Sequence, residues 1–194
     1  GDMLQEAMEK RQQSGLDILY LLQDMREFEL YGTVRAVVCI CDSLNYITEY
    51  KDLVQVFSLV NNYLDPGGIF VFDCNTEYKY REIMGNRTIA ESREDCSFVW
   101  ENEYDAESGI NEYDLTIFVK EEGELFRRYE ETHYQRAYSI DEIKRAVLEA
   151  GMELVAVYDA FTRQDVRENS ERVYVVARER GKQAQTEAKG GCVE

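Results

Sequence analysis

Long hydrophobic runs are absent from this sequence. No apolar segment approaches the ~20 residues that a membrane-spanning helix needs, and no signal-peptide pattern stands ahead of the first expected helix. The content of hydrophobic residues, 44%, is ordinary for a globular chain of 194 residues. The sequence therefore predicts one soluble domain, or slightly more, with no membrane partner.

Basic clusters are absent too. The chain has 22 Lys and Arg residues against 39 Asp and Glu residues, which gives a formal net charge of −17. Binding to a phosphate backbone needs a clustered basic surface, and no run of Lys or Arg occurs. This excludes nucleic acid as a partner, and we interpret the negative charge as a solubility feature.

The five cysteines follow neither a disulfide framework nor the spacing of zinc ligands. Cys39 and Cys41 lie two positions apart at an expected strand, and Cys192 lies near the end of the chain. We interpret the cysteines as reduced thiols, which predicts a cytoplasmic protein without a metal site.

Two apolar, β-rich runs, at residues 34–40 and 69–72, are each followed by polar residues. Between them, apolar residues recur at helical spacing: Leu53, Val56, Phe57, Val60 and Leu64. This order predicts a βαβ unit of a parallel sheet. Because open α/β sheets bind ligands beyond the carboxyl ends of their strands, we expect a site at those polar residues.

Four sequence stretches carry a resemblance to a known family. They are a DPGG turn before the strand that ends at Asp73, DML at the start of the first expected helix, LDILYLLQDMREFEL and CDSLNYI. In their order and spacing they resemble class I S-adenosylmethionine-dependent methyltransferases, of the bacterial small-molecule type with a β-insert, over residues 2–178. The resemblance implies a Rossmann-like α/β fold, doubly wound and mostly parallel, with a further strand at residues 17–22. It also implies S-adenosyl-L-methionine as the cofactor.

The family pattern begins with a strand and a GxGxG turn, and the sequence contains no such turn. The resemblance therefore implies an incomplete Rossmann-like sheet, in which the strand at 34–40 has an open edge and the strand at 17–22 is separated from it. Three outcomes stay open. The two strands pair directly, a second copy completes the sheet as a homo-oligomer, or the sequence is a truncated piece of a longer protein.

The second half of the chain combines an insert with the end of the core. Alternating, aromatic-rich runs at residues 98–104, 111–120 and 125–138 predict antiparallel hairpins. Ser139 with Glu142 predicts a capping box that opens a helix.

Hairpin-like strands at 152–160 and 172–177 would close the sheet. The expected division is a methyltransferase core at 1–91 and 139–180, an antiparallel β-insert or lid at 92–138, and a disordered tail at 181–194.

By resemblance, the cofactor contacts follow the strands at 17–22 and 34–40. The Asp24 carboxylate would accept a hydrogen bond from the adenine amino group, Met25 would pack near the ring, and Cys41 and Asp42 would lie beside the cofactor. The alternative for Asp24 is a turn or helix-capping role, and for Asp42 an N-cap or Asx turn.

The methyl acceptor would be bound at the same edge of the sheet. The candidate residues are Asp42, Asn45, Tyr46, Asp73, Asn75 and Arg136. For Asp73 and Asn75, turn formation is the alternative role.

His133 is the only histidine of the chain and the candidate catalytic residue. Histidine changes charge near working pH, so it could accept a proton from the acceptor during methylation. The alternative is a solvated or hydrogen-bonded structural histidine. The tyrosines and Trp100 of the insert either line an aromatic pocket or fill a core.

The predicted function is methyl transfer from S-adenosyl-L-methionine to a small-molecule acceptor in the intact protein. This chain alone is expected to be inactive, because the glycine turn and the acid that would hold the ribose are absent from it. The alternative is a non-catalytic fragment, or a truncated paralogue, that acts as a binding or assembly module.

Overall fold

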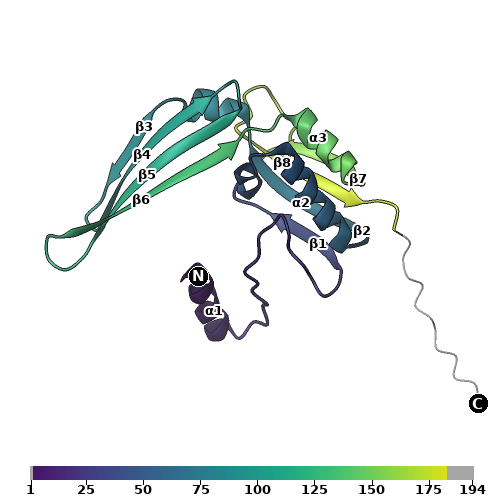
Figure 1. Ribbon diagram of the computed structural model, residues 1–194, viewed down its shortest axis with the longest axis horizontal. Coiled ribbons are helices and arrows are strands. Elements are labelled where there is room, and N and C mark those ends of the chain that lie inside the picture. The colour runs from purple at the N-terminus through teal and green to yellow at the C-terminus, as the bar shows by residue number, and fades with distance from the viewer. Residues whose placement is uncertain (1, 183–194) are drawn as a thin grey trace, which may run out of the picture.

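Two β-sheets of four strands each dominate the computed structural model, which describes residues 2–182 (Figure 1). Sheet A has the strand order β1-β2-β8-β7, and sheet B has the order β3-β4-β5-β6. Helices α2 and α3 lie against sheet A, while sheet B extends away as an arm (Figure 1). The α/β class is therefore confirmed.

Sheet A is mixed, with one strand running against the other three. Its strands are β1 (Val34–Cys39), β2 (Leu64–Asn75), β7 (Met152–Asp159) and β8 (Arg172–Glu179). Only β1 and β2 pair in parallel, whereas β8 is antiparallel to both β2 and β7. The predicted βαβ unit and the closing hairpin are confirmed. Strand β7 therefore runs in the same direction as β1 and β2, and β8 alone runs against them, because the two strands of a hairpin have opposite directions.

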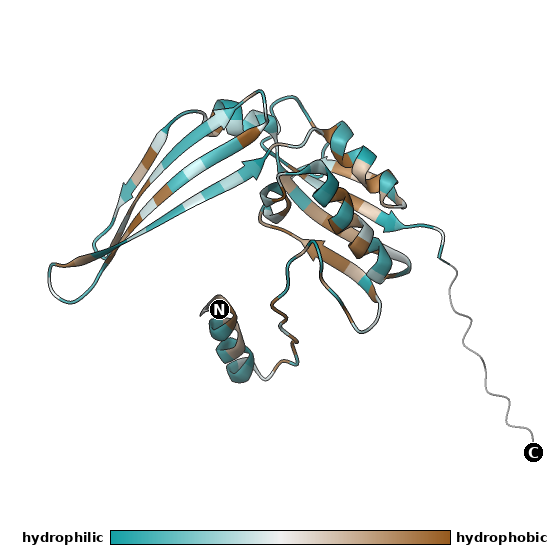
Figure 2. Ribbon diagram, in the orientation of Figure 1, coloured by the Kyte–Doolittle hydropathy of each residue, from teal (hydrophilic) through white to brown (hydrophobic). Residues whose placement is uncertain are grey.

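The core lies between sheet A and the two helices α2 (Tyr50–Tyr63) and α3 (Ile140–Glu149). The ring of Phe57 on α2 packs 5.5 Å from that of Phe70 and 5.1 Å from that of Phe72. Figure 2 shows hydrophobic residues concentrated on the strands beneath these helices. The helical spacing of apolar residues thus marks the buried side of α2, as predicted.

The DPGG turn needs both of its glycines. Gly67 has a φ of +72°, a conformation that side chains rarely adopt. A Cβ atom at Gly68 would lie 2.9 Å from the carbonyl oxygen of Asp65 and 3.1 Å from that of Arg35. The turn therefore brings the start of β2 against β1 at a distance that only glycine permits.

The strand expected at residues 17–22 does not form. Helix α1 (Asp2–Ser14) is present as predicted, but residues 16–24 have no strand or helix assignment and pair with no strand in the described part of the chain. β1 lies at the edge of sheet A, with Val38 62% and Ile40 54% exposed. The expected open edge is confirmed, and direct pairing of 17–22 with β1 does not occur. The open edge of β1 is the part of the predicted incomplete Rossmann-like sheet that is observed, and the rest of that prediction is not confirmed.

Sheet B consists of β3 (Thr88–Ser92), β4 (Cys96–Asp105), β5 (Ile110–Lys120) and β6 (Phe126–Arg136), and a short π-helix, η2 (Lys79–Met84), leads into it. The three predicted hairpin strands match β4, β5 and β6. β3 is an addition, so the sheet begins ahead of the expected boundary at residue 92.

The remaining expectations concern the tail and the membrane. The Lys182 ammonium donates to the carbonyl oxygens of Asn61 and Leu64, at 2.5 and 2.7 Å, so the first residues of the expected tail are held against the core. Residues 183–194 lie outside the described residues. Within residues 2–182, no helix has both the length and the apolar character needed to cross a membrane.

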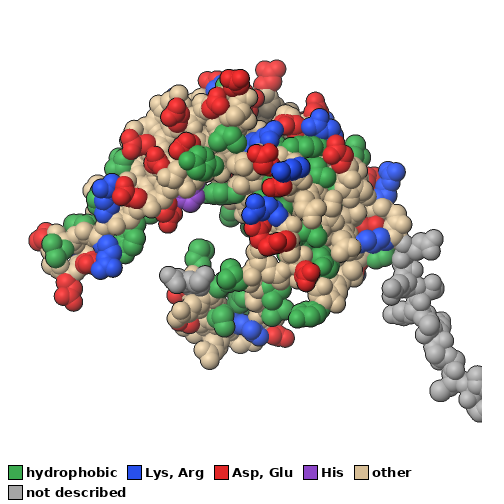
Figure 3. Space-filling model, in the orientation of Figure 1, with side chains coloured by type: hydrophobic (Ala, Val, Ile, Leu, Met, Phe, Trp, Pro, Cys, Tyr) green, Lys and Arg blue, Asp and Glu red, His purple; other side chains and the backbone are tan. Residues whose placement is uncertain are grey.

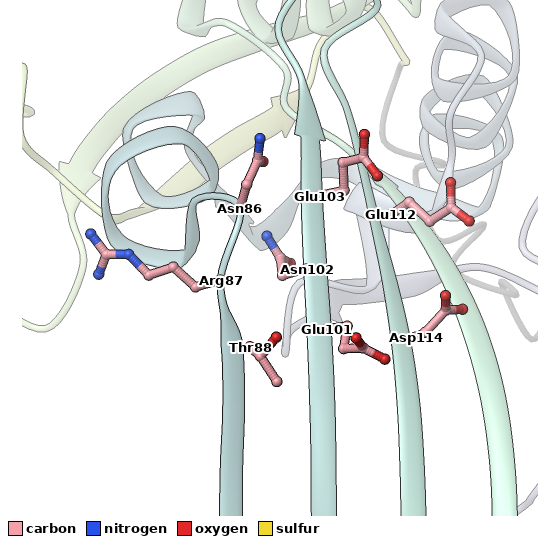
Figure 4. A pocket seen from close by; sticks show the side chains of 8 residues that line it. All are labelled: Asn86, Arg87, Thr88, Glu101, Asn102, Glu103, Glu112 and Asp114. Atoms are coloured by element: carbon pink, nitrogen blue, oxygen red, sulfur yellow. The ribbon is translucent and has the colours of Figure 1, made fainter.

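Sheet B has two chemically different faces. We call inner the face that carries Trp100, Tyr113 and His133, and outer the face that carries the acidic residues Glu101, Glu103, Glu112 and Asp114. The outer residues line a recess of about 390 Å³ (Figure 4). Two pairs of like charges lie directly opposite each other there: Glu101 with Asp114 and Glu103 with Glu112.

We expect Glu103→Lys to stabilise the protein, because it replaces a cross-strand repulsion by an attraction worth roughly 0.5 kcal/mol. Urea unfolding measures the difference. Glu107→Lys is the matched control, since it changes the net charge equally but lies in the exposed turn between β4 and β5. Equal stabilisation by both variants would show that only net charge matters.

The capping box at α3 gives a second stability prediction. The Ser139 hydroxyl accepts from the backbone N–H of Glu142, and the Glu142 carboxylate accepts from that of Ser139 at 2.9 Å. Ser139→Ala should lower the free energy of unfolding by about 1 kcal/mol, whereas Ser139→Thr should retain most of it. An unchanged urea midpoint for the alanine variant would contradict this role.

Candidate functional site

The predicted polar residues meet where β1 and β2 end, at an edge that we call the rim. After β1, Cys41 and Asp42 both adopt left-handed backbone conformations, with φ of 63° and 50°. The backbone N–H of Asp42 donates to the Asp73 carboxylate at 2.8 Å. The side chain of Asp42 makes no capping bond to the 3-10 helix η1 (Ser43–Tyr46) that it precedes. Its carboxylate is therefore directed to the rim and not used as an N-cap.

A partly buried arginine joins the two carboxylates of the rim. The Arg172 guanidinium donates to Asp73 at 2.5 Å and to Asp42 at 2.6 Å. Burial opposes the charge, but the hydrogen bonds to Asp73 and Asp42 outweigh it and raise the pKa of Arg172. The sequence analysis did not single out Arg172. Its position in the sequence could have indicated this role. Arg172 is the first residue of the closing strand, and a strand antiparallel to β2 begins beside the carboxyl end of β2.

Behind the rim lies a group of buried amides. Asn45 is fully buried, donates to the carbonyl oxygens of Asn75 and Arg136, and accepts from the backbone N–H of Asn75. The Arg136 guanidinium donates to the Thr48 carbonyl at 3.0 Å and to Glu142 at 3.1 Å. Asn45, Asn75 and Arg136 thus hold loops together, and acceptor contact by them stays a prediction.

A second line of hydrogen bonds ties sheet B to the rim. Gln135 of β6 donates to Asp42 at 2.9 Å, and its amide oxygen accepts from Tyr80 at 3.0 Å. Lys79 donates to Asn75 at 3.0 Å. Burial, and then the nearby Arg172 charge, lower the pKa of Lys79.

Two of the four residues expected on the cofactor side, Asp24 and Met25, lie in a recess of about 360 Å³, whereas Cys41 and Asp42 do not line it. Asp24, Met25 and Tyr46 line it together. The Asp24 carboxylate accepts from the side chain of Arg26 at 2.6 Å and from its backbone N–H at 2.9 Å. Hydrogen bonding by Arg26 lowers the pKa of Asp24 to about 2. The turn role considered for Asp24 is thus observed, and its contact with adenine stays a prediction.

Tyr46 also reaches the inner face of sheet B. Its hydroxyl lies 2.6 Å from that of Tyr113 and 3.2 Å from Nδ1 of His133. His133 stacks on Tyr113, with ring centroids 4.8 Å apart, and its Nε2 lies 3.1 Å from the Glu131 carboxylate. Of the alternatives for His133, a hydrogen-bonded histidine is the one observed. Its partners Tyr113 and Glu131 were not predicted as site residues.

The recess and the rim are neighbouring polar surfaces, each of which could hold a ligand. A carboxylate and a thioether line the recess, and further carboxylates lie at the rim. Figure 3 shows the molecule hollowed between sheet B and the core, with hydrophobic side chains along the hollow. Two reactants could therefore be held next to each other at Tyr46.

Comparison with known proteins bears on this arrangement. The chain is 34% identical over 180 residues to the "Putative methyltransferase YqeM" of Bacillus subtilis strain 168, covering 91% of this chain and 72% of that protein. It is 31% identical over 177 residues to the "Putative methyltransferase GWCH70_2453" of Geobacillus sp. strain WCH70, with the same two coverages of 91% and 72%. No family model matches the sequence.

A solved structure agrees with these relatives. The S-adenosylmethionine-dependent methyltransferase from Clostridium acetobutylicum ATCC 824 superposes with a TM-score of 0.86 at 28% identity, over 93% of this chain and 72% of that one. The resemblance drawn from the four sequence stretches is therefore confirmed, and so is S-adenosylmethionine as the cofactor of this group. This chain belongs to the S-adenosylmethionine-dependent methyltransferase family.

Proposed function

We propose that the protein transfers a methyl group from S-adenosyl-L-methionine to a small-molecule acceptor bound between the rim and the inner face of sheet B. The observation that carries the proposal is the position of Tyr46, which lines the recess of Asp24 and Met25 and also contacts Tyr113 and His133. One side chain thus borders both reactant sites.

On the cofactor side, Asp24 would accept from the adenine amino group and Met25 would pack on the ring. Cys41 and Asp42, in the left-handed turn after β1, would border the methionine part. When bound, the cofactor supplies an electrophilic methyl group on a sulfonium. The carboxylates of the rim favour that positive charge.

On the acceptor side, Asp42, Tyr46 and Asp73 would orient the nucleophile, and His133 would receive its proton. Catalysis of this kind depends mainly on holding two reactants in line away from water. Asn45, Asn75 and Arg136 would contribute by keeping the rim in place through their buried hydrogen bonds. The acidic chain favours a small molecule over nucleic acid.

A second candidate function is that of a binding or assembly module. The open edge of β1 and the exposed Leu19 and Leu22 support it, because an unpaired apolar strand edge accepts another strand. In a homo-oligomer, a strand of a second copy would supply the missing hydrogen bonds of this edge.

The four described cysteines are free thiols, which suits a reducing compartment such as the cytoplasm.

We expect the 194-residue chain by itself to bind S-adenosyl-L-methionine more weakly than micromolar, because its sequence has no GxGxG turn to supply backbone donors. NMR of ¹³C-methyl methionine reports such weak binding directly. The Met25 signal should shift on titration with the cofactor, and Asp24→Asn should reduce the shift. Because the pKa of Asp24 is about 2, the response should be the same at pH 7 and pH 5.

Two controls belong to this titration. The signal of Met152, which is 2% exposed in the core, should not move. Glu27→Gln, close to Asp24 on the exposed loop, should leave the Met25 response intact. A stationary Met25 signal would remove this recess from the cofactor site, and micromolar affinity by calorimetry would show that the missing donors matter little.

The rim gives a stability prediction. Arg172→Met leaves the carboxylates of Asp42 and Asp73 without their shared cation, and should lower the free energy of unfolding by roughly 2 kcal/mol. Arg178→Met is the matched control, because Arg178 lies on the same strand but is exposed. Equal urea midpoints for the two variants would contradict the importance of the Arg172 bridge.

A further inference from the structure

We propose that Tyr46, His133 and Glu131 form a proton relay, and that the methyl acceptor of this protein is an amine that arrives as an ammonium ion. The inference rests on the proposed methyl transfer and deepens it. It assigns a chemical class to the acceptor and an atom to each position of its proton.

The hydrogen bonds of the relay define its direction. Tyr46 lies 3.2 Å from Nδ1 of His133, and Nε2 lies 3.1 Å from the Glu131 carboxylate. An ionised carboxylate only accepts, so the ring proton belongs on Nε2 and Nδ1 is free to accept from the Tyr46 hydroxyl. The burial of Tyr113, and then its bond to Tyr46, raise the pKa of Tyr113. Tyr113 therefore stays protonated and donates to the Tyr46 oxygen.

This arrangement leaves one lone pair of the Tyr46 oxygen unused. Tyr46 is 43% exposed and lies between the rim and sheet B, so a ligand can reach it. His133 is less exposed, at 27% of its side chain. A ligand proton would therefore enter the relay at Tyr46.

The surroundings of the relay favour a cation. The inner face around it presents aromatic rings, among which Trp100 packs 5.1 Å from Tyr113. The charged groups of the rim and of Glu131 are the carboxylates of Glu131, Asp42 and Asp73 and the cations of Arg172 and Lys79. The recess that Tyr46 borders adds the carboxylates of Asp24 and Asp52 and the cation of Arg26. Five carboxylates thus face three cations, and each cation is already hydrogen-bonded within the rim or the recess. Aromatic faces and unbalanced carboxylates together attract an ammonium group with an apolar body.

The outer face of sheet B carries a tyrosine and a glutamate that take no part in the relay. Tyr134 follows His133 in β6, and its hydroxyl donates to Glu112 on the outer face at 3.1 Å. Glu130 likewise precedes Glu131 and bonds with Arg128. Tyr134 therefore serves as the matched control for Tyr46, and Glu130 as the matched control for Glu131.

The proton transfer balances without any further reactant. One N–H bond of the ammonium breaks as an O–H bond forms at Tyr46, and the earlier Tyr46 proton moves to Nδ1 of His133. The negative charge of the Glu131 carboxylate stabilises the positive charge of the resulting imidazolium. The amine then carries the free electron pair that forms the new N–CH₃ bond, while the methyl group leaves its sulfur.

Binding of a probe amine to the chain tests the ligand class without cofactor. We compare 2-phenylethylamine with 2-phenylethanol at pH 7 and follow the ¹⁵N-labelled imidazole of His133, the only histidine. The amine should bind about tenfold more tightly than the alcohol, the range expected for one cation held by aromatic rings and a carboxylate. Equal affinities, or no response of His133 to either probe, would overturn the amine assignment.

Variants test the relay itself. Tyr46→Phe should shift the Nδ1 resonance of free His133, and Glu131→Gln should shift the Nε2 resonance and remove most of the preference for the amine. The controls Tyr134→Phe and Glu130→Gln should leave both unchanged. If the relay variants behave like the controls, the relay is refuted. Because cofactor binding is measured separately at Met25, failure of the amine titration alone refutes the amine acceptor and leaves the proposed methyl transfer standing. A stationary Met25 signal with intact amine binding would instead count against the cofactor recess, and would leave the relay as an amine-binding site only.

Discussion

The double ion pair of Arg172 is the contact on which the rest of the site depends. It spans the ends of β1 and β2 and the start of β8, and it keeps the carboxylates of Asp42 and Asp73 close together. Without a cation between them, two carboxylates at this distance would repel. The left-handed turn at Cys41 and Asp42 is strained, and the bond from Asp42 N–H to Asp73 holds it in that conformation. The position of η1, and hence of Tyr46, follows from this turn.

Tyr46 connects parts of the protein that are far apart in sequence. Tyr46 is the last residue of η1, which follows β1 of sheet A. Its hydroxyl nevertheless bonds with residues of β5 and β6 in sheet B. Gln135 reinforces the same junction by donating to Asp42. The junction therefore sets the orientation of the aromatic inner face relative to the rim. A shift of sheet B would move Tyr46 and Asp42, and a shift of the rim would move the inner face.

Much of the fold could be predicted from the sequence, because its signals are local. The apolar spacing of α2, the capping box of Ser139 and the turn-separated strands of sheet B depend on neighbours within a few residues. The strand expected at residues 17–22 failed for the opposite reason. A strand exists only when a partner pairs with it, and local apolar content cannot supply one. The direction of β8 follows from the predicted hairpin with β7, whereas its place beside β2 depends on strand pairing that no local pattern specifies.

The site was predictable in position but not in detail. Asp42, Tyr46 and Asp73 follow strands whose carboxyl ends meet, and a general rule of open sheets places them together. Arg172, Gln135 and Glu131 come from segments more than fifty residues away, and only the register of β6 and β8 brings them in. The hydrogen bonds that Asp24 and Asp42 make within the protein are specified by no sequence pattern, and their contacts with cofactor and acceptor stay predictions.

The attachment of sheet B at one end has an evolutionary consequence. Its strands meet the core near Gln135 and Asn102, while the turn at residues 121–125 lies at the other end of β5 and β6. Strand length and the distal turn can therefore change between related proteins without disturbing the rim, because no contact of the rim passes through them. If the acceptor lies on the inner face of sheet B, as proposed, a longer or shorter hairpin would change the space available to it while the rim stays as it is.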